Sequence, residues 1–303
     1  METEPSIRRG RPKTPLLDRL RVVVWAHHVM HASGERAAEA FELRYANPRG
    51  KIHLSRGLWS RYLRGETIPQ SAVARSDRSL VKRLDAEFPG TGEIFSHPVW
   101  RLLDFQELLG PDQLLVEYIH LGEAIWLQFV NFIEQPGISK PPLPGAFWSM
   151  HLKSVERKQR LSRLSGLDGV AACLIEGRMG FLSQTEERFV TSMLSARKYF
   201  NQLAKTEPFS YRRAQTALLV MEGYCIAYLE RVCIAASNNG DSYTLLKSKQ
   251  LEWRHDWGVQ CQAHSAKLSP SSFQTFKSWL MTAAATEPSR PCRPGRGILV
   301  WMK

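Results

Sequence analysis

Helical periodicity runs through most of the chain and constrains its fold more than any other feature. After residue 150, apolar residues recur at three- and four-residue spacing, with few strand-like alternations between them. This pattern covers roughly residues 151–164, 167–180, 184–205, 210–236, 244–263 and 271–285. In the longest segment a core-facing stripe is expected at Leu218, Met221, Cys225, Tyr228 and Val232. The sequence therefore predicts an all-α fold.

The N-terminal part predicts a smaller set of helices. Residues 16–31 form the first, which ends at Ser33-Gly34, and residues 35–46 form the second. A third begins near Ser55 and a fourth spans residues 77–87. The residues expected to face inward are Leu16, Leu20, Val23, Val24 and His27, then Ala38, Phe41 and Tyr45, then Leu80, Val81 and Leu84.

Length and composition indicate about two domains, since 303 residues with 43% hydrophobic content can bury a sizeable core. Residues 1–15 are expected to be a flexible basic arm, and residues 16–88 an N-terminal helical module. The connecting segment 89–111 contains a short amphipathic helix, "VWRLLDFQELLG". A larger α-helical domain, for dimerisation, sensing or partner binding, follows over residues 112–287. It opens with an apolar helix at 112–134 and bends at the proline-rich residues 135–145. Residues 288–303 form a basic tail that is either mobile or docked through its final apolar residues.

The charge is uneven along the chain. Residues 8–83 carry 17 basic and 6 acidic side chains, residues 84–152 carry 2 and 9, and residues 153–303 carry 22 and 12. A basic surplus favours a polyanionic partner such as nucleic acid. Alternatively, the acidic middle docks on a basic neighbour within the same chain.

The five cysteines form no C-x-x-C pair, and their odd number and wide spacing are typical of free thiols in a reducing compartment. No apolar segment has the length or position of a signal peptide or a membrane span. We therefore expect a cytoplasmic protein that does not bind a membrane.

The segment "LSRGLWSRYLRGETIP", residues 54–69, carries the most informative motif. Ser55 is placed to cap a helix, Gly65 to end it in the left-handed conformation, and Trp59 and Tyr62 to pack inward. With Ser60, Arg61 and Pro69, this pattern resembles the lambda-repressor and Cro type (XRE-like) of helix-turn-helix, over about residues 16–88. The connection between the second and third helices is longer than the three or four residues of a compact turn.

That resemblance implies a recognition helix near residues 55–65 that docks on double-stranded DNA. Its base-facing residues would be Arg56, Gly57 and Leu58, with Arg56 on a guanine and Leu58 against a thymine methyl. Phosphate contacts would come from Ser60, Arg61 and Arg64, and from Arg49 and Lys51 in the preceding loop. The alternative is a helical hairpin whose arginine face is solvated.

The run "IRRGRPKTP", residues 7–15, resembles an AT-hook. Arg9 and Arg11 would enter the narrow minor groove, Gly10 would allow close approach, and Pro12 would keep the chain extended, with Arg8 and Lys13 flanking them. Position directly before the helix-turn-helix candidate favours a minor-groove arm over a merely charged leader.

No catalytic motif for phosphate, dinucleotide, zinc-protease or serine-hydrolase chemistry is present, so we expect no enzyme, no cofactor and no metal site. His27, His28 and His31 have helical spacing but lack further ligands nearby in sequence. Gly177 and Gly180 are expected to mark a helix end. The polar cluster Glu252, Arg254, His255 and Asp256, between two tryptophans, is expected to form ion pairs beside buried indoles.

Two functions fit these patterns. The first is a DNA-binding bacterial transcriptional regulator, with the helical domain forming a homodimer or sensing a partner. The second is a non-catalytic subunit of a mobile-element, toxin-antitoxin or phage-defence complex, which binds DNA or structured RNA and holds another protein.

Overall fold

The computed structural model describes residues 15–47, 52–69, 79–105, 164–182, 186–238 and 244–285, and eight single positions between 107 and 121. Every regular element in this part of the chain is a helix, which confirms the all-α prediction. The predicted helices at 112–134 and 151–164, the proline-rich bend and the tail lie largely or wholly outside the described residues.

Five helices form the N-terminal module: α1 (Leu16–Ser33), α2 (Ala38–Arg44), α3 (Leu58–Leu63), α4 (Leu80–Glu87) and α5 (Thr91–Ser96). They enclose a cluster that we name the aromatic core: Val22, Trp25, Ala26, Val29, Met30, Phe41, Ile52, Leu54, Trp59, Tyr62, Leu63, Leu80, Val81, Leu84 and Phe95. Trp25 meets Trp59, Tyr62 and Phe95 edge-on at centroid distances of 5.4, 6.0 and 5.5 Å. Such edge-to-face pairs add stability beyond the area they bury.

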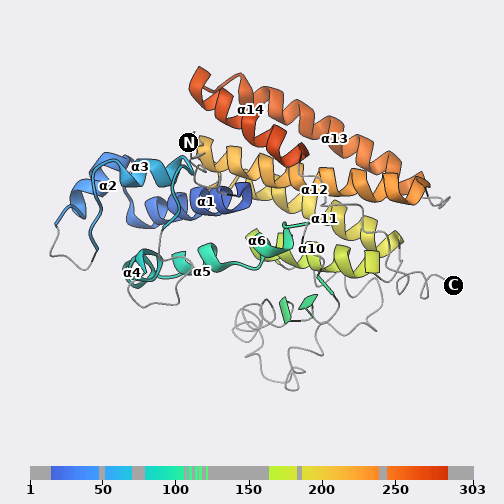
Figure 1. The fold of residues 1–303 in the computed structure, drawn as a ribbon, viewed down its shortest axis with the longest axis horizontal. Coiled ribbons are helices and arrows are strands. Elements are labelled where there is room, and N and C mark those ends of the chain that lie inside the picture. Colours follow the sequence, from blue (N-terminus) through green and yellow to red (C-terminus); the bar gives the residue numbers. More distant parts are fainter. Residues whose placement is uncertain are drawn as a thin grey trace, which may run out of the picture.

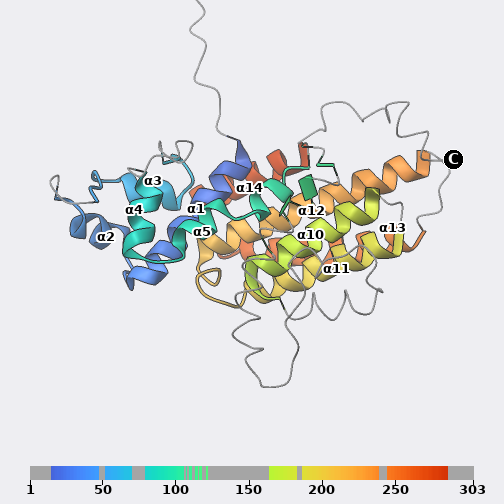
Figure 2. The same cartoon turned by 90° about the horizontal axis from the view of Figure 1, so that it is seen from below.

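Longer helices form the bundle: α10 (Gly166–Leu182), α11 (Glu186–Leu203), α12 (Arg212–Asn238), α13 (Thr244–Ser265) and α14 (Pro270–Ala285). The N-terminal module lies at one end of the molecule and the bundle at the other, as two perpendicular views show (Figures 1 and 2). Of the predicted α12 stripe, Leu218, Met221 and Cys225 are buried and Tyr228 is half-buried.

Glycines bring α10 and α11 together. A Cβ atom at Gly169 would lie 2.6 Å from the Tyr199 ring, and one at Gly177 would lie 2.9 Å from Met193 Sδ. The prediction that Gly177 marks a helix end is wrong, because α10 continues to Leu182, whereas Gly180 lies two residues before that end. At Gly177 the missing side chain provides space for the neighbouring helix.

Helix α1 belongs to both halves of the molecule. Its residues Leu16, Leu20, Val23 and Val24 join the bundle core, which we define as this group with the buried apolar residues of α6 (Val99–Leu102) and α10–α14. Other α1 residues, Trp25 among them, join the aromatic core. The domain boundary at residue 88 stays a prediction, but α5 beyond it contributes Phe95 to the aromatic core.

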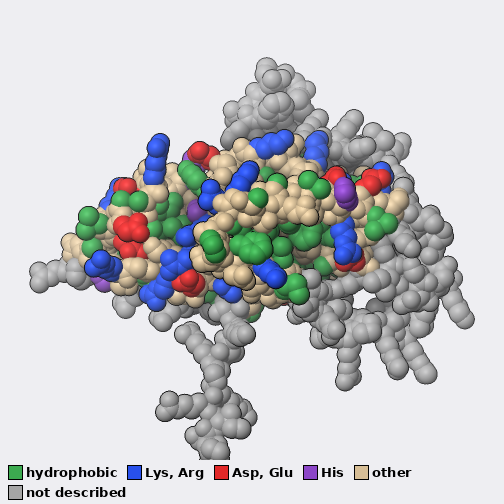
Figure 3. All heavy atoms as spheres, turned by 90° about the horizontal axis from the view of Figure 1, so that it is seen from above, with side chains coloured by type: hydrophobic (Ala, Val, Ile, Leu, Met, Phe, Trp, Pro, Cys, Tyr) green, Lys and Arg blue, Asp and Glu red, His purple; other side chains and the backbone are tan. Residues whose placement is uncertain are grey.

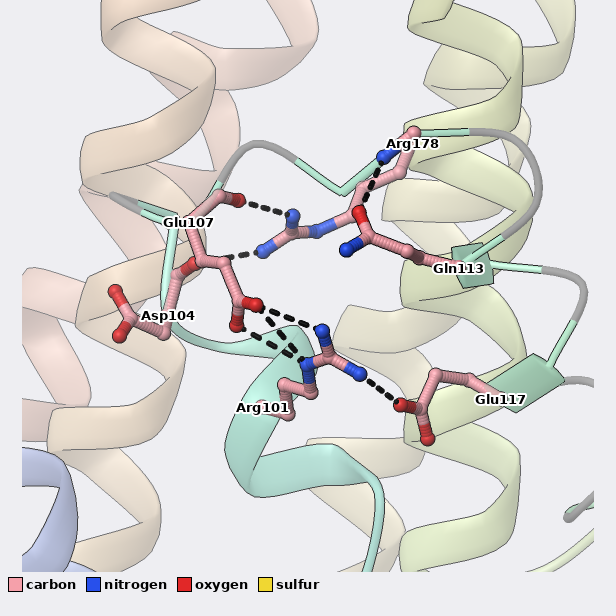
Figure 4. Close-up of polar contacts among 7 residues, drawn as sticks. Arg101, Asp104, Glu107, Gln113, Glu117 and Arg178 are labelled. Carbon is pink, nitrogen blue, oxygen red and sulfur yellow. Dashed lines mark hydrogen bonds and ion pairs between the residues drawn. The ribbon is translucent and has the colours of Figure 1, made fainter.

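Beyond α6 the connecting segment is held by a buried arginine (Figure 4). Arg178 of α10 is 7% exposed and donates to the backbone carbonyls of Leu102, Asp104 and Glu107 at 2.8, 3.0 and 2.9 Å. Burial lowers the pKa of Arg178. The predicted helix over residues 99–110 ends at Leu102, and these carbonyl groups bind Arg178 instead of continuing the helix. Arg178 lies in residues 153–303 and its partners in residues 84–152, but the hydrogen-bond acceptors are backbone carbonyl groups rather than acidic side chains.

A second arginine fixes the same segment from the other side. Arg101 pairs with Glu107 at 2.7 Å and with Glu117 at 2.8 Å (Figure 4). The Phe105 ring stacks on Tyr228 of α12 at a centroid distance of 4.1 Å, and the Arg178 guanidinium lies over it. Polar and aromatic contacts therefore join this segment to the bundle.

Among the described helices, none has the length and apolar character needed to cross a membrane. Cys173, Cys225 and Cys261 are free and buried, and burial raises the pKa of each thiol.

Candidate nucleic-acid interface

The first turn of α3 is capped by a carboxylate from α2. Glu42 is 7% exposed and accepts hydrogen bonds from the backbone N–H groups of Gly57, Trp59 and Ser60 at 2.7, 2.6 and 3.2 Å. An ionised carboxylate at this position also interacts favourably with the helix dipole. The N-terminal end of α3 is therefore already occupied by a carboxyl group of the protein itself.

The prediction that Ser55 caps this helix is wrong. Residues 55–57 form a turn, in which the Leu58 N–H donates to the Ser55 carbonyl at 3.1 Å and Gly57 adopts a φ of 75°. The helix begins at Leu58 because Glu42, rather than Ser55, accepts its first N–H groups.

The three residues expected to face bases differ in their surroundings. Arg56 is exposed and makes no hydrogen bond or ion pair with a described residue. The Gly57 N–H is donated to Glu42, and Leu58 is half-buried against the aromatic core. Arg56 is therefore the one of the three whose side chain is available to a ligand.

The residues expected to bind phosphate also differ in exposure and in hydrogen-bond partners. Arg61 is exposed, with no hydrogen-bond or ion-pair partner among the residues described. Ser60 is half-buried, and Arg64 binds Glu66 through two hydrogen bonds of 2.6 and 3.0 Å. The pKa of Arg64 is raised by this pairing.

The remaining predicted contacts lie outside the described residues: Arg49, Lys51, Arg8, Arg9, Gly10, Arg11, Pro12 and Lys13. Of the 17 basic side chains in residues 8–83, nine are described, together with five of the six acidic ones. Most of the basic surplus of this region therefore falls in the segments that the structure does not describe.

Inside the module, the expected packing of α3 is confirmed. Trp59 and Tyr62 are buried, and Trp59 lies 4.5 Å from the Phe41 ring between centroids. Gly65 adopts a left-handed φ of 63° and its N–H donates to the Tyr62 carbonyl. A hydrogen bond of 2.8 Å from Arg19 Nε to the Gly65 carbonyl ties this end of α3 to α1.

The connection between α2 and α3, residues 45–57, is long for a compact helix-turn-helix. Its ends are nevertheless joined, since the Leu54 N–H donates to the Tyr45 carbonyl at 2.9 Å. Glu42 and the Phe41–Trp59 contact hold the two helices against each other, so their packing does not depend on a short turn.

The histidines of α1 contact the segment between α11 and α12. His27 stacks on Tyr211 and His28 packs edge-on against Phe209. Burial, with nearby Arg213 and His28, lowers the pKa of His27 to about 3. His27 is therefore a neutral packing residue that helps to join the two halves of the molecule.

In α13, the polar cluster forms the surface ion pairs that were expected. Arg254 pairs with Glu230, and Asp256 pairs with Arg197. Trp253 is buried, and its indole N–H donates to Glu222 at 2.6 Å.

The structure also brings together three arginines that the sequence pattern does not connect. A cavity of about 190 Å³ lies between α1, the end of α3, α12 and α14. We name it the arginine pocket. Its charged lining residues are Arg19, Arg64, Glu66 and Arg213, and hydroxyl groups come from Thr216, Ser271, Ser272 and Thr275.

A larger cavity, of about 470 Å³, lies between α1, α6 and α12. Its arginines are neutralised by neighbours, since Arg21 pairs with Asp18 and Arg101 pairs with Glu107. Only the arginine pocket of these two combines a cavity with an excess of positive charge.

Comparisons of the chain with protein-family models, with curated proteins and with solved structures found no match.

Proposed function

We propose that the chain is a DNA-binding protein of the cytoplasm, a bacterial transcriptional regulator that docks the segment around residues 55–65 on duplex DNA. The observation that carries this proposal is the pair Arg56 and Arg61. Both are exposed and neither has a hydrogen-bond or ion-pair partner among the described residues. Guanidinium groups in such positions can bind phosphates and the edges of guanine.

The backbone beneath these arginines is well supported. Trp59 and Tyr62 anchor α3 in the aromatic core, and Glu42 fixes the turn that carries Arg56. A supported backbone lowers the entropic cost of presenting two long side chains to a ligand. With the α3 N-terminus already capped, binding would depend on side chains rather than on free N–H groups.

The test is the double variant Arg56→Ala/Arg61→Ala, measured against duplex DNA over a salt series. We expect the affinity to fall because the base contact of Arg56 is lost, and the slope of log affinity against log salt to fall by about 1 because Arg61 gives up one phosphate contact. The matched control is Lys198→Ala/Lys205→Ala, which removes the same charge from exposed positions in the bundle half. Equal affinities and slopes for the wild type and the Arg56/Arg61 variant would refute the proposal.

A minor-groove arm is the second part of the proposal. Deletion of residues 1–14 is expected to weaken binding to A·T-flanked sites more than to G·C-flanked ones, because a narrow minor groove attracts arginine. An equal loss on both would identify the run as a charged leader.

The alternative function, a nucleic-acid-binding subunit of a larger complex, is favoured by one surface. Apolar side chains gather on the face of the bundle that Figure 3 shows. The exposed large apolar residues of α13 and α14 are Leu251, Val259, Phe273 and Met281. A regulator should be a homodimer that protects a palindromic site. A monomer that binds structured RNA as tightly as duplex DNA would favour the subunit.

A further inference from the structure

The arginine pocket holds more positive charge than the protein itself neutralises. Three guanidinium groups, from Arg19, Arg64 and Arg213, line it together with one carboxylate, Glu66. Arg19 and Arg64 have hydrogen-bond partners, the Gly65 carbonyl and Glu66 respectively. Arg213 makes no hydrogen bond or ion pair with any described residue, although it lies within electrostatic range of both Arg64 and Glu66.

Bringing these arginines together is electrostatically unfavourable. Partial burial lowers the pKa of Arg19 and of Arg213, which is still exposed to solvent on one side, and the positive charge of Arg64 lowers the pKa of Arg213 further. Like charges in a partly desolvated cavity repel each other, and a bound anion would relieve that repulsion.

We propose that the arginine pocket binds a phosphate group. Three positive charges against one negative charge leave a local excess of two, which matches a phosphate dianion. Planar guanidinium groups donate paired hydrogen bonds that fit phosphate oxygens. This inference does not rest on the DNA-binding proposal.

The size and lining of the pocket favour one phosphate group over a larger ligand. Its volume of about 190 Å³ lies below the range of roughly 300–1,000 Å³ typical of sites that enclose a whole small molecule. Ser271, Ser272 and Thr275, from the first turns of α14, add hydroxyl groups to the lining. The positive end of the α14 dipole supplements the arginine charges.

Glu66 is the internal competitor of such a ligand. Its hydrogen bonds from Arg64, with the charges of Arg19 and Arg213, lower the pKa of Glu66 and keep it ionised. A phosphate entering the pocket would be repelled by this carboxylate while it is attracted by the arginines. Removal of Glu66 should therefore strengthen binding, whereas removal of Arg213 should weaken it.

The first experiment measures stabilisation of the full chain by inorganic phosphate, against chloride at equal ionic strength, at about pH 7.5 where phosphate is mostly a dianion. We expect Arg213→Gln to weaken phosphate binding about 10-fold, since it removes charged hydrogen bonds to the ligand. Glu66→Gln is expected to strengthen binding about 3-fold or more, by removing a nearby like charge.

The matched control is Arg212→Gln, because Arg212 is exposed like its neighbour Arg213 but does not line the pocket. It should bind phosphate like the wild type. The proposal is wrong if phosphate and chloride stabilise the wild type equally, or if Arg212→Gln and Arg213→Gln lose the same amount. Unfolding of each variant without phosphate checks that its fold is intact.

A phosphate group could come from a free phosphorylated small molecule or from a nucleic-acid backbone, and a duplex DNA measurement separates the two. If Arg213→Gln lowers phosphate binding but not DNA affinity, the ligand is a free phosphate compound. If it lowers both, the pocket holds a backbone phosphate. Loss of DNA affinity in the Arg56/Arg61 variant with phosphate binding retained would test the DNA-binding proposal separately.

Discussion

The aromatic core and the bundle core stabilise their helices by different means. In the N-terminal module, α2, α3 and α5 have only six or seven residues, which is too short for a helix to be stable on its own. They depend on a few large rings and on specific caps such as Glu42. The bundle uses helices of 16–27 residues with close glycine contacts, so its stability is spread over many side chains.

The buried carboxyl groups of the two cores also differ in their number of hydrogen-bond partners. Glu42 accepts hydrogen bonds from three backbone N–H groups, so both of its carboxyl oxygens have partners. Glu222 in the bundle accepts one hydrogen bond, from Trp253, and burial raises the pKa of Glu222 to about 7. A buried carboxyl group therefore caps a helix in the N-terminal module, at Glu42, and lowers stability in the bundle, at Glu222.

The largest expected effect is in the aromatic core. Trp59→Ala should lower the free energy of unfolding by about 3–5 kcal/mol, because a fully buried ring is lost and a cavity remains. Urea unfolding followed by circular dichroism measures this loss. Trp59→Phe, which keeps part of the ring packing, should lose less than half as much. A loss below about 1 kcal/mol for the alanine variant would mean that the aromatic rings do not dominate the stability of the N-terminal module.

The second effect concerns Glu222 and has a definite sign. Between the unfolded pKa near 4.5 and the folded pKa of about 7, the folded state binds more protons, so rising pH favours unfolding. This group lowers stability by up to about 3 kcal/mol above pH 7. Glu222→Gln should remove that loss, and the variant should be more stable than the wild type at about pH 8.

The measurement is the difference in unfolding free energy between wild type and Glu222→Gln at about pH 5 and pH 8. The difference between the two proteins is used because His27 changes the stability of both in the opposite direction. The pKa of His27 is lowered to about 3, so its contribution to the free energy of unfolding is lost as pH falls below 6.5. Glu230→Gln, at a surface ion pair with Arg254, is the control and should change little. Parallel pH curves for wild type and Glu222→Gln would contradict the prediction.

The same substitution should have the opposite sign at Glu42. Glu42→Gln is expected to cost about 2 kcal/mol, because a neutral amide oxygen is a weaker acceptor for the three N–H groups of α3. Thermal unfolding near pH 8 compares it directly with Glu222→Gln. If both variants gain stability, the distinction between the two carboxylates fails.

The smallest effect compares two left-handed glycines. Gly34 and Gly65 have φ angles of 72° and 63°, but only Gly65 is crowded, since its Cβ would lie 3.0 Å from Val23 and 3.1 Å from the Arg19 carbonyl oxygen. Gly65→Ala should therefore cost about 1 kcal/mol more than Gly34→Ala. Denaturant midpoints of the two variants, measured in parallel, test this difference. Equal losses of stability would show that the contact between α1 and α3 is loose.

Local patterns predicted the long helices well, because apolar spacing over many residues specifies them. Residues 210–236 and 271–285 correspond closely to α12 and α14. The start of α3 could not be predicted this way, because its cap comes from Glu42 on another helix. Helix α5 was not predicted, because six residues are too few to show a helical pattern, although its residue Phe95 is buried in the aromatic core.

The candidate sites show the same limit. Arg56 and Arg61 were found from the local motif around Trp59. The arginine pocket was not, because Arg19 and Arg213 are far apart in sequence and are brought together only by the packing of α1 against α12 and α14.

The sharing of α1 between the two cores has a consequence for proteolysis. A protease that cut after α5 would release the N-terminal module without the bundle helices that cover Leu16, Leu20, Val23 and Val24. Such a fragment would expose an apolar stripe along α1 and would be prone to aggregate. Cleavage at this point would therefore not yield an N-terminal module that is stable by itself.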